Sequence, residues 1–94
     1  MILHLDFETR SDVDLKKAGL HEYARGRNTS ILCAAYAFDD EPVELWLPAH
    51  QRIPERVAGH VFSGGEVHAH NAAFERELWN CTEPSWPPLA DDQL

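Results

Sequence analysis

The sequence predicts a small α/β domain built on a mixed β-sheet, and three apolar segments carry this prediction. An apolar run over residues 2–7 is typical of a strand buried on at least one side. The longest apolar run, residues 31–38, has apolar side chains in alternate and intervening positions, which predicts a central strand covered on both faces. Residues 43–47 alternate in polarity after a short turn, so we expect an antiparallel hairpin.

Helical patterns complete the predicted order. Residues 11–29 indicate one or two helical turns before Gly and Asn interrupt them. Pro54 opens a helix over residues 54–62, in which Val57, Ala58, Val61 and Phe62 would form the apolar face. A short strand at residues 67–69 precedes a helix over residues 72–80 that Asn71 would cap. A crossover helix before this strand predicts that it lies parallel to one of the other strands.

The final segment, residues 82–94, is rich in Pro and acidic residues and shows no periodicity. We expect it to be an extended or frayed tail that follows a folded unit at residues 1–81. The 94 residues are enough for one domain with a modest core. We expect the three Trp side chains, Trp46, Trp79 and Trp86, to be core or edge-covering residues.

Composition narrows the class of protein. The net charge of −8 argues against binding nucleic acid by bulk electrostatic attraction. The basic residues are concentrated early, however, and this segment is either a solvated mixed-charge surface or a rim that steers phosphates. We expect no membrane span, a cytoplasmic location, and two reduced cysteines, Cys33 and Cys81. The concentrated basic residues are Arg10, Lys16, Lys17, Arg25 and Arg27.

Asp6 and Glu8 are the most informative pair of residues. They are two positions apart in the first predicted strand, so both side chains leave the same face. Two carboxylates in that arrangement are either surface acids or ligands for Mg²⁺ or Mn²⁺, which prefer oxygen. Glu75 is a third acid, near the start of a helix that would lie beside this strand. Taken alone, it is better explained as an ordinary acid at a helix N-terminus, where the dipole favours a negative charge.

Two motifs resemble those of the DEDD 3′–5′ exonucleases, a family with a ribonuclease H-like fold. The segment Asp6-Phe-Glu8-Thr9 resembles their first motif, and His70-Asn71-Ala-Ala-Phe74-Glu75 resembles the second, where the acid is usually Asp. The stretch between them is similar to the N-terminal exonuclease region of phage and prophage family A DNA polymerases. The resemblance implies a ribonuclease H-like partial domain, with a three-stranded antiparallel meander, a fourth parallel strand and two helices.

The resemblance also implies roles in DNA replication and in hydrolysis of the 3′ ends of single-stranded DNA. Asp6, Glu8 and Glu75 would be the catalytic residues and would hold two magnesium or manganese ions. The substrate contacts would come from Thr9, Tyr23, Asn71 and Phe74. For Asn71 and Phe74, helix capping and core packing are equally good explanations.

The chain lacks the third motif of that family, Tyr-x-x-x-Asp, which supplies the last metal carboxylate. We therefore expect the truncated N-terminal half of a proofreading-type nuclease domain, with an incomplete metal site. Such a half leaves an uncovered sheet edge and face, which predicts a homo-oligomer or docking onto a missing C-terminal portion. An alternative is an inactive prophage remnant that serves as a docking module. A third is a small zinc protein using His68 and His70, with His4 nearby.

Overall fold

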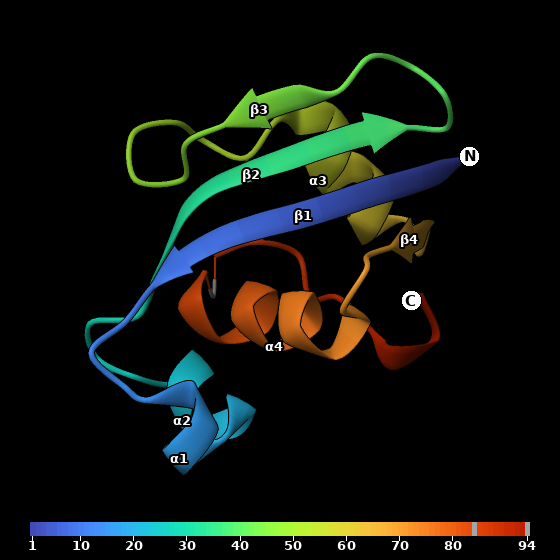
Figure 1. The fold of residues 1–94 in the computed structure, drawn as a ribbon. Helices are drawn as coiled ribbons and strands as arrows, with labels where there is room; N and C mark the ends of the chain where they lie inside the picture. The colour runs from blue at the N-terminus through green and yellow to red at the C-terminus, as the bar shows by residue number, and fades with distance from the viewer. Residues whose placement is uncertain (84, 94) are drawn as a thin grey trace.

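The computed structural model describes residues 1–83 and 85–93, which form a mixed α/β fold around one four-stranded sheet (Figure 1). Strands β1 and β2 pair antiparallel, as do β2 and β3, while β4 runs parallel to β1. This confirms the predicted meander with a fourth, parallel strand. The sheet order is β3-β2-β1-β4, and the strands are β1 (Ile2–Arg10), β2 (Ser30–Phe38), β3 (Glu44–Trp46) and β4 (Glu66–His68).

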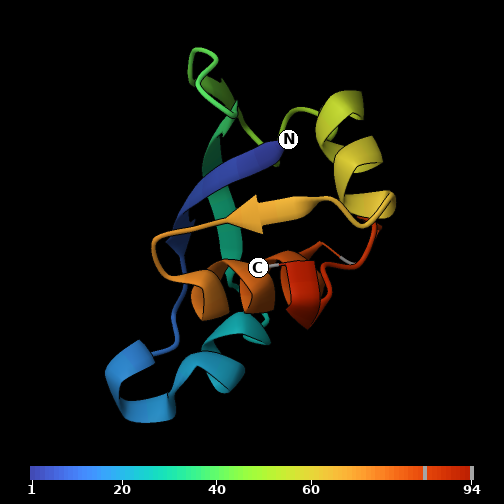
Figure 2. The same ribbon diagram turned by 90° about the vertical axis from the view of Figure 1, so that its right-hand side faces the viewer.

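The two longer helices lie on the same side of the sheet (Figure 2). Two short helices fill the link between β1 and β2, where the sequence predicted one or two helical turns. None of the helices in the described ranges is long and apolar enough to cross a membrane. The helices are α1 (Leu15–Ala18), α2 (Leu20–Ala24), α3 (Glu55–Phe62) and α4 (Ala72–Thr82), followed by a 3₁₀ turn, η1 (Asp91–Gln93).

Helix α3 ends at Phe62, as the sequence predicted, and begins at Glu55, one residue after the predicted start. Pro54 occupies its N-cap position, and the turn after Ser63 places Gly64 at a φ of 82°, a conformation that Gly adopts without steric cost. Val57 and Val61 are buried against the sheet. The prediction that Phe62 belongs to the apolar face is wrong, because its side chain is 83% exposed.

The core lies between the sheet and helices α3 and α4. Alternate residues of β1 face this layer and are buried, namely Leu3, Leu5 and Phe7. Trp46 from β3 and Trp79 from α4 reach the same layer, and their rings contact that of Trp86, which confirms the prediction that all three tryptophans are core residues.

The other face of the sheet carries no helix among the described residues (Figure 2). We call this the open face. Opposed residues of neighbouring strands share it, so its residues follow from the strand register: His4, Asp6 and Glu8 of β1, Cys33, Ala35 and Ala37 of β2, Leu45 of β3 and His68 of β4. The prediction that β2 is covered on both faces is therefore wrong for the described residues, since one face of the sheet is open.

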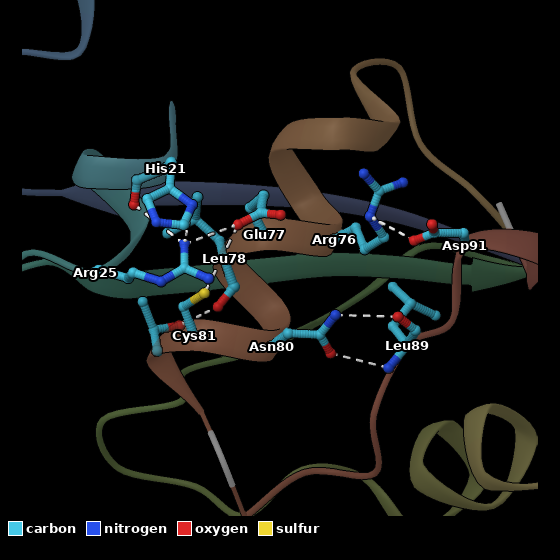
Figure 3. Close-up of polar contacts among 10 residues, drawn as sticks. His21, Arg25, Arg76, Glu77, Leu78, Asn80, Cys81, Leu89 and Asp91 are labelled. Atoms are coloured by element: carbon cyan, nitrogen blue, oxygen red, sulfur yellow. Dashed lines mark hydrogen bonds and ion pairs between the residues drawn. The ribbon is translucent and has the colours of Figure 1, made fainter. Parts of the chain in front are cut away.

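The segment after α4 packs against the core, so the prediction of a frayed tail is wrong for residues 85–93. Trp86 and Leu89 are buried. The side chain of Asn80 accepts a hydrogen bond from the Leu89 backbone N–H and donates one to its carbonyl oxygen, at 2.9 and 3.0 Å (Figure 3). Gln93 donates to the carbonyl oxygens of Val61 and Gly65, which fastens η1 to the end of α3. Pro84 and Leu94 of the predicted tail lie outside the described residues.

Candidate active site

Asp6 and Glu8 lie inside β1 rather than at its end, because the strand continues to Arg10. Both carboxylates are exposed on the open face, which confirms that they leave the strand in the same direction. Their cross-strand neighbours there are Ala35 and Cys33. Since Ala is small and Cys33 is half-buried, the two carboxylates stand above a low surface that solvent and a cation can reach.

Glu75 is placed differently from the other two acids. It lies in the first turn of α4, and its side chain is only 3% exposed. Its Oε2 atom is buried and has no hydrogen-bond partner. Burial raises the pKa of this carboxyl group, and the negative charge of Asp6 raises it further.

The groups that oppose the rise in the Glu75 pKa indicate where its carboxyl group lies. Hydrogen bonding from its own backbone N–H and from that of Phe7 lowers the pKa of Glu75. Phe7 is the residue between Asp6 and Glu8 in β1. The Glu75 carboxyl group therefore approaches the acidic pair from the helix-covered side of the sheet, whereas the pair itself faces the open side.

The three acids are close neighbours but do not form a ready-made ligand cluster. Among residues 1–83 and 85–93, no group of three or more His, Cys, Asp or Glu side chains is arranged to hold a metal ion. The sequence pattern correctly predicted that Asp6 and Glu8 are neighbours in β1. It did not reveal that Glu75 would be buried while the other two carboxylates are exposed.

Three of the four predicted substrate residues contact one another. The hydroxyl groups of Thr9 and Tyr23 are hydrogen-bonded at 2.9 Å. The Tyr23 ring lies against that of Phe74, with centroids 6.1 Å apart. Asn71 is exposed and occupies the predicted N-cap position of α4, but its side chain makes no capping hydrogen bond.

A hollow of about 470 Å³ lies on the open face beside Asp6. The rings of His4 in β1 and His68 in β4 meet edge to face, with centroids 5.7 Å apart, which confirms the expected proximity of His4. Sequence reasoning missed Tyr36 and Val43, which also line the hollow. Val43 lies just before β3, and Tyr36 belongs to β2, where it pairs with Leu5 and packs its ring against the core residue Trp46. No local pattern in the sequence connects either residue with Asp6.

Polar contacts fasten α2 to α4 beside the candidate site (Figure 3). Arg25 forms an ion pair with Glu77 at 3.2 Å and also contacts the ring nitrogen of His21 at 2.7 Å. The Cys81 thiol lies 3.8 Å from the same Glu77 carboxylate, and burial raises the pKa of this thiol. Cys33 and Cys81 are both free, in agreement with the prediction of reduced cysteines.

Comparison with known proteins gives one informative match. The chain is 42% identical over 76 residues to a protein named DNA polymerase from Bacillus phage SP02. The matched region covers 79% of this chain but only 12% of that polymerase. No protein-family model matches the chain, and no solved structure matches it. The match shows that this chain is related to a phage DNA polymerase.

Proposed function

We propose that the chain is the N-terminal part of a polymerase-associated 3′–5′ exonuclease domain of the ribonuclease H-like class. The observation that carries the proposal is the Glu75 carboxyl group, which is buried with an unpartnered Oε2 atom at the residue that separates Asp6 from Glu8. A buried oxygen without a hydrogen-bond partner is costly unless something pairs with it. A divalent cation is the partner that would explain it, and the relation to a phage DNA polymerase favours a nuclease context.

The side chains fit magnesium or manganese in their donor chemistry. All three candidate ligands, Asp6, Glu8 and Glu75, offer carboxylate oxygens, which both ions prefer. Bound there, such ions would lower the pKa of a coordinated water and stabilise the charge that develops on a phosphodiester. The protein's part would be to present the Asp6 and Glu8 carboxylates on an accessible face and to keep Glu75 shielded beside them.

Exposed cations in the segment that follows the acids support the proposed substrate class. Arg10, Lys16, Lys17 and Arg27 are exposed on the side of the link that follows β1, whereas the chain as a whole has a net charge of −8. Local cations of this kind hold phosphates near an acidic site without binding duplex DNA in bulk. A frayed 3′ end of single-stranded DNA is the substrate that this arrangement suits, with Thr9 beside the terminal nucleotide.

Single-turnover cleavage of a 3′-labelled single-stranded DNA with Mn²⁺ tests the proposal. We expect slow removal of 3′ nucleotides by the wild-type chain and none above background by Asp6→Ala, because that variant loses an open-face ligand. Asp12→Ala is the matched control, since Asp12 is an exposed acid that bonds Asn28 in the link, and it should cleave like the wild type. Cleavage by neither the wild-type chain nor the control at stoichiometric protein would contradict a nuclease role.

A second candidate function is a non-catalytic docking module. It is favoured by the exposed apolar side chains at the third strand, Val43 and Leu45, each 69% exposed, and by the lack of three gathered ligands among the described residues. Exposed apolar side chains grouped beside an uncovered sheet face are typical of a surface that binds another protein. In the cleavage assay this function predicts no product at any Mn²⁺ concentration.

A further inference from the structure

Tyr23 contacts both segments that carry the candidate metal ligands. Its hydroxyl group is hydrogen-bonded to Thr9, the residue after Glu8, at 2.9 Å. Its ring packs on Phe74, the residue before Glu75, with an interplanar angle of 36°. Figure 1 shows α2, which carries Tyr23, in the link that follows β1 and beside helix α4.

The backbone that carries Tyr23 is itself held in place. The Tyr23 carbonyl oxygen accepts hydrogen bonds from the Thr29 hydroxyl at 2.7 Å and from the Gly26 N–H at 3.2 Å. Thr29 is buried, and the ion pair of Arg25 with Glu77 ties the same helix to α4. The backbone at Tyr23 is therefore held by contacts on two sides of α2.

The strand pairing breaks next to the hydrogen bond between Tyr23 and Thr9. The β1–β2 register shifts between Glu8 and Thr9, so Glu8 pairs with Cys33 while Thr9 pairs with Ile31. A bulge of this kind re-aims side chains and loosens the ladder locally. The hydroxyl bond from Tyr23 restrains the chain at the point where the ladder does not.

A base-stacking role fits Tyr23 poorly. Its ring is half-buried and packs on Phe74, and its hydroxyl group is already bonded to Thr9. A stacking platform needs a ring face that is open to a nucleotide base. The contacts of Tyr23 instead reach the two segments that carry Glu8 and Glu75. A metal site built from these acids would need a fixed separation between the two segments.

We propose that Tyr23 is a positioning residue that sets the placement of Glu8 relative to Glu75 and thereby the affinity of the site for divalent metal. The inference rests on the proposed function, because it assumes that these acids are ligands. Partners that orient metal ligands typically change metal affinity about 10–100-fold when they are removed. Tyr23 acts through Thr9 and Phe74, so we expect its effect at the lower end of that range.

The test measures Mn²⁺ binding by water-proton relaxation in Tyr23→Phe, which keeps the ring and removes the hydroxyl group. We expect its dissociation constant to rise about tenfold. Thr9→Val should give the same increase, and the double variant should add nothing further because both changes break one hydrogen bond. The control is Ser63→Ala, which removes an exposed hydroxyl bond to the His60 carbonyl oxygen at the end of α3 and should leave the dissociation constant unchanged. Wild-type affinity in Tyr23→Phe would overturn the inference.

A metal-free readout separates this inference from the proposed function. If the wild-type chain binds no Mn²⁺, the nuclease proposal fails, and amide hydrogen exchange then decides the role of Tyr23. Faster exchange at both Glu8 and Glu75 in Tyr23→Phe, relative to Ser63→Ala, would show that the hydroxyl group couples the two segments. Unchanged exchange at either residue would overturn the coupling.

Discussion

Glu75 shows how one buried acid makes stability depend on pH. Burial raises its pKa above the ordinary value of 4.5, and Asp6 adds to the shift. Between the unfolded and folded pKa values the folded chain holds a proton that the unfolded chain has released. The folded state binds more protons there, so the free energy of unfolding falls as the pH rises through that interval.

Glu75→Gln should remove this dependence while it keeps the side-chain volume. We expect the variant to be more stable than the wild type at pH 7 in EDTA, and to show a flatter loss of stability above pH 4.5. Urea unfolding at several pH values measures both effects. Glu22→Gln, an exposed acid of α2, is the control and should follow the wild-type curve. An unaltered slope in Glu75→Gln would mean that another group causes the pH dependence.

Asn80 makes a second contribution that belongs to a single side chain. Its amide pairs with both backbone groups of Leu89, in the way a neighbouring strand would. Asn80→Ala should lower the free energy of unfolding by about 1–2 kcal/mol, since each lost hydrogen bond costs roughly 0.5–1.5 kcal/mol. Asn28→Ala, which loses an exposed bond to Asp12, should cost less than about 0.5 kcal/mol. Equal losses in urea unfolding of the two variants would contradict a special role for Asn80.

The sequence identified Asp6 and Glu8 as neighbours on one face because alternation along a strand is a local rule. The burial of Glu75 is not local. It depends on how closely α4 approaches Phe7, and this is decided by packing of Leu78 and Trp79 on the sheet. A sequence pattern gives the residue type and its place in the helix, but not the depth at which the helix sets it.

At the scale of elements, β1 is longer than its apolar run because pairing extends it. The polar residues from Glu8 to Arg10 have no strand pattern of their own, yet they pair with β2 as far as Ser30. Tertiary pairing overrides weak local preference, and this is common for strands. Strand β2 shows the opposite case. Its apolar sequence suits burial on both faces, although one of its faces is open.

The segment after α4 is the element that sequence reasoning described least well. The segment is rich in Pro and acidic residues and has no periodicity. A single Trp in such a stretch gives no repeating signal, so the sequence did not predict that the segment packs against the core. Trp86 packs against Phe7, Trp46 and Trp79. The segment therefore completes the core between β3 and α4.

Trp86→Ala tests the contribution of this segment to stability. We expect a loss of about 3–5 kcal/mol in the free energy of unfolding, because the change removes a large buried ring and leaves a cavity. Phe62→Ala is the matched control, since its ring is 83% exposed, and it should change stability by no more than about 0.5 kcal/mol. Chemical denaturation followed by circular dichroism measures both variants. A loss below about 1 kcal/mol for Trp86→Ala would contradict the packed arrangement.

At the scale of the whole molecule, the sheet has one covered and one uncovered face. The strand order and directions were predictable, because a short hairpin turn and a crossover helix each permit few arrangements. Which face would lack helices was not, since that depends on where α3 and α4 both settle. Leu45 and Ala35 lie in the same cross-strand row as Asp6 on the uncovered side.

We expect the isolated chain to self-associate through this open face. An apolar patch on an uncovered sheet is stabilised when it is buried against a second surface. Sedimentation equilibrium at high micromolar concentration should give a mass above that of the monomer, and Leu45→Glu should restore the monomer. Leu15→Glu, at an exposed position of α1, should still associate. A monomeric wild-type chain throughout this range would contradict the prediction.

The tryptophan cluster has a practical consequence for studies of this chain in solution. The indole rings of Trp79 and Trp86 are 4.7 Å apart, and that of Trp46 is 5.9 Å from Trp86. Aromatic chromophores this close couple their electronic transitions and produce a paired band in circular dichroism. Detachment of the last segment would separate one chromophore from the other two and abolish the coupling. The chain thus contains its own label-free optical reporter for the closure of its core.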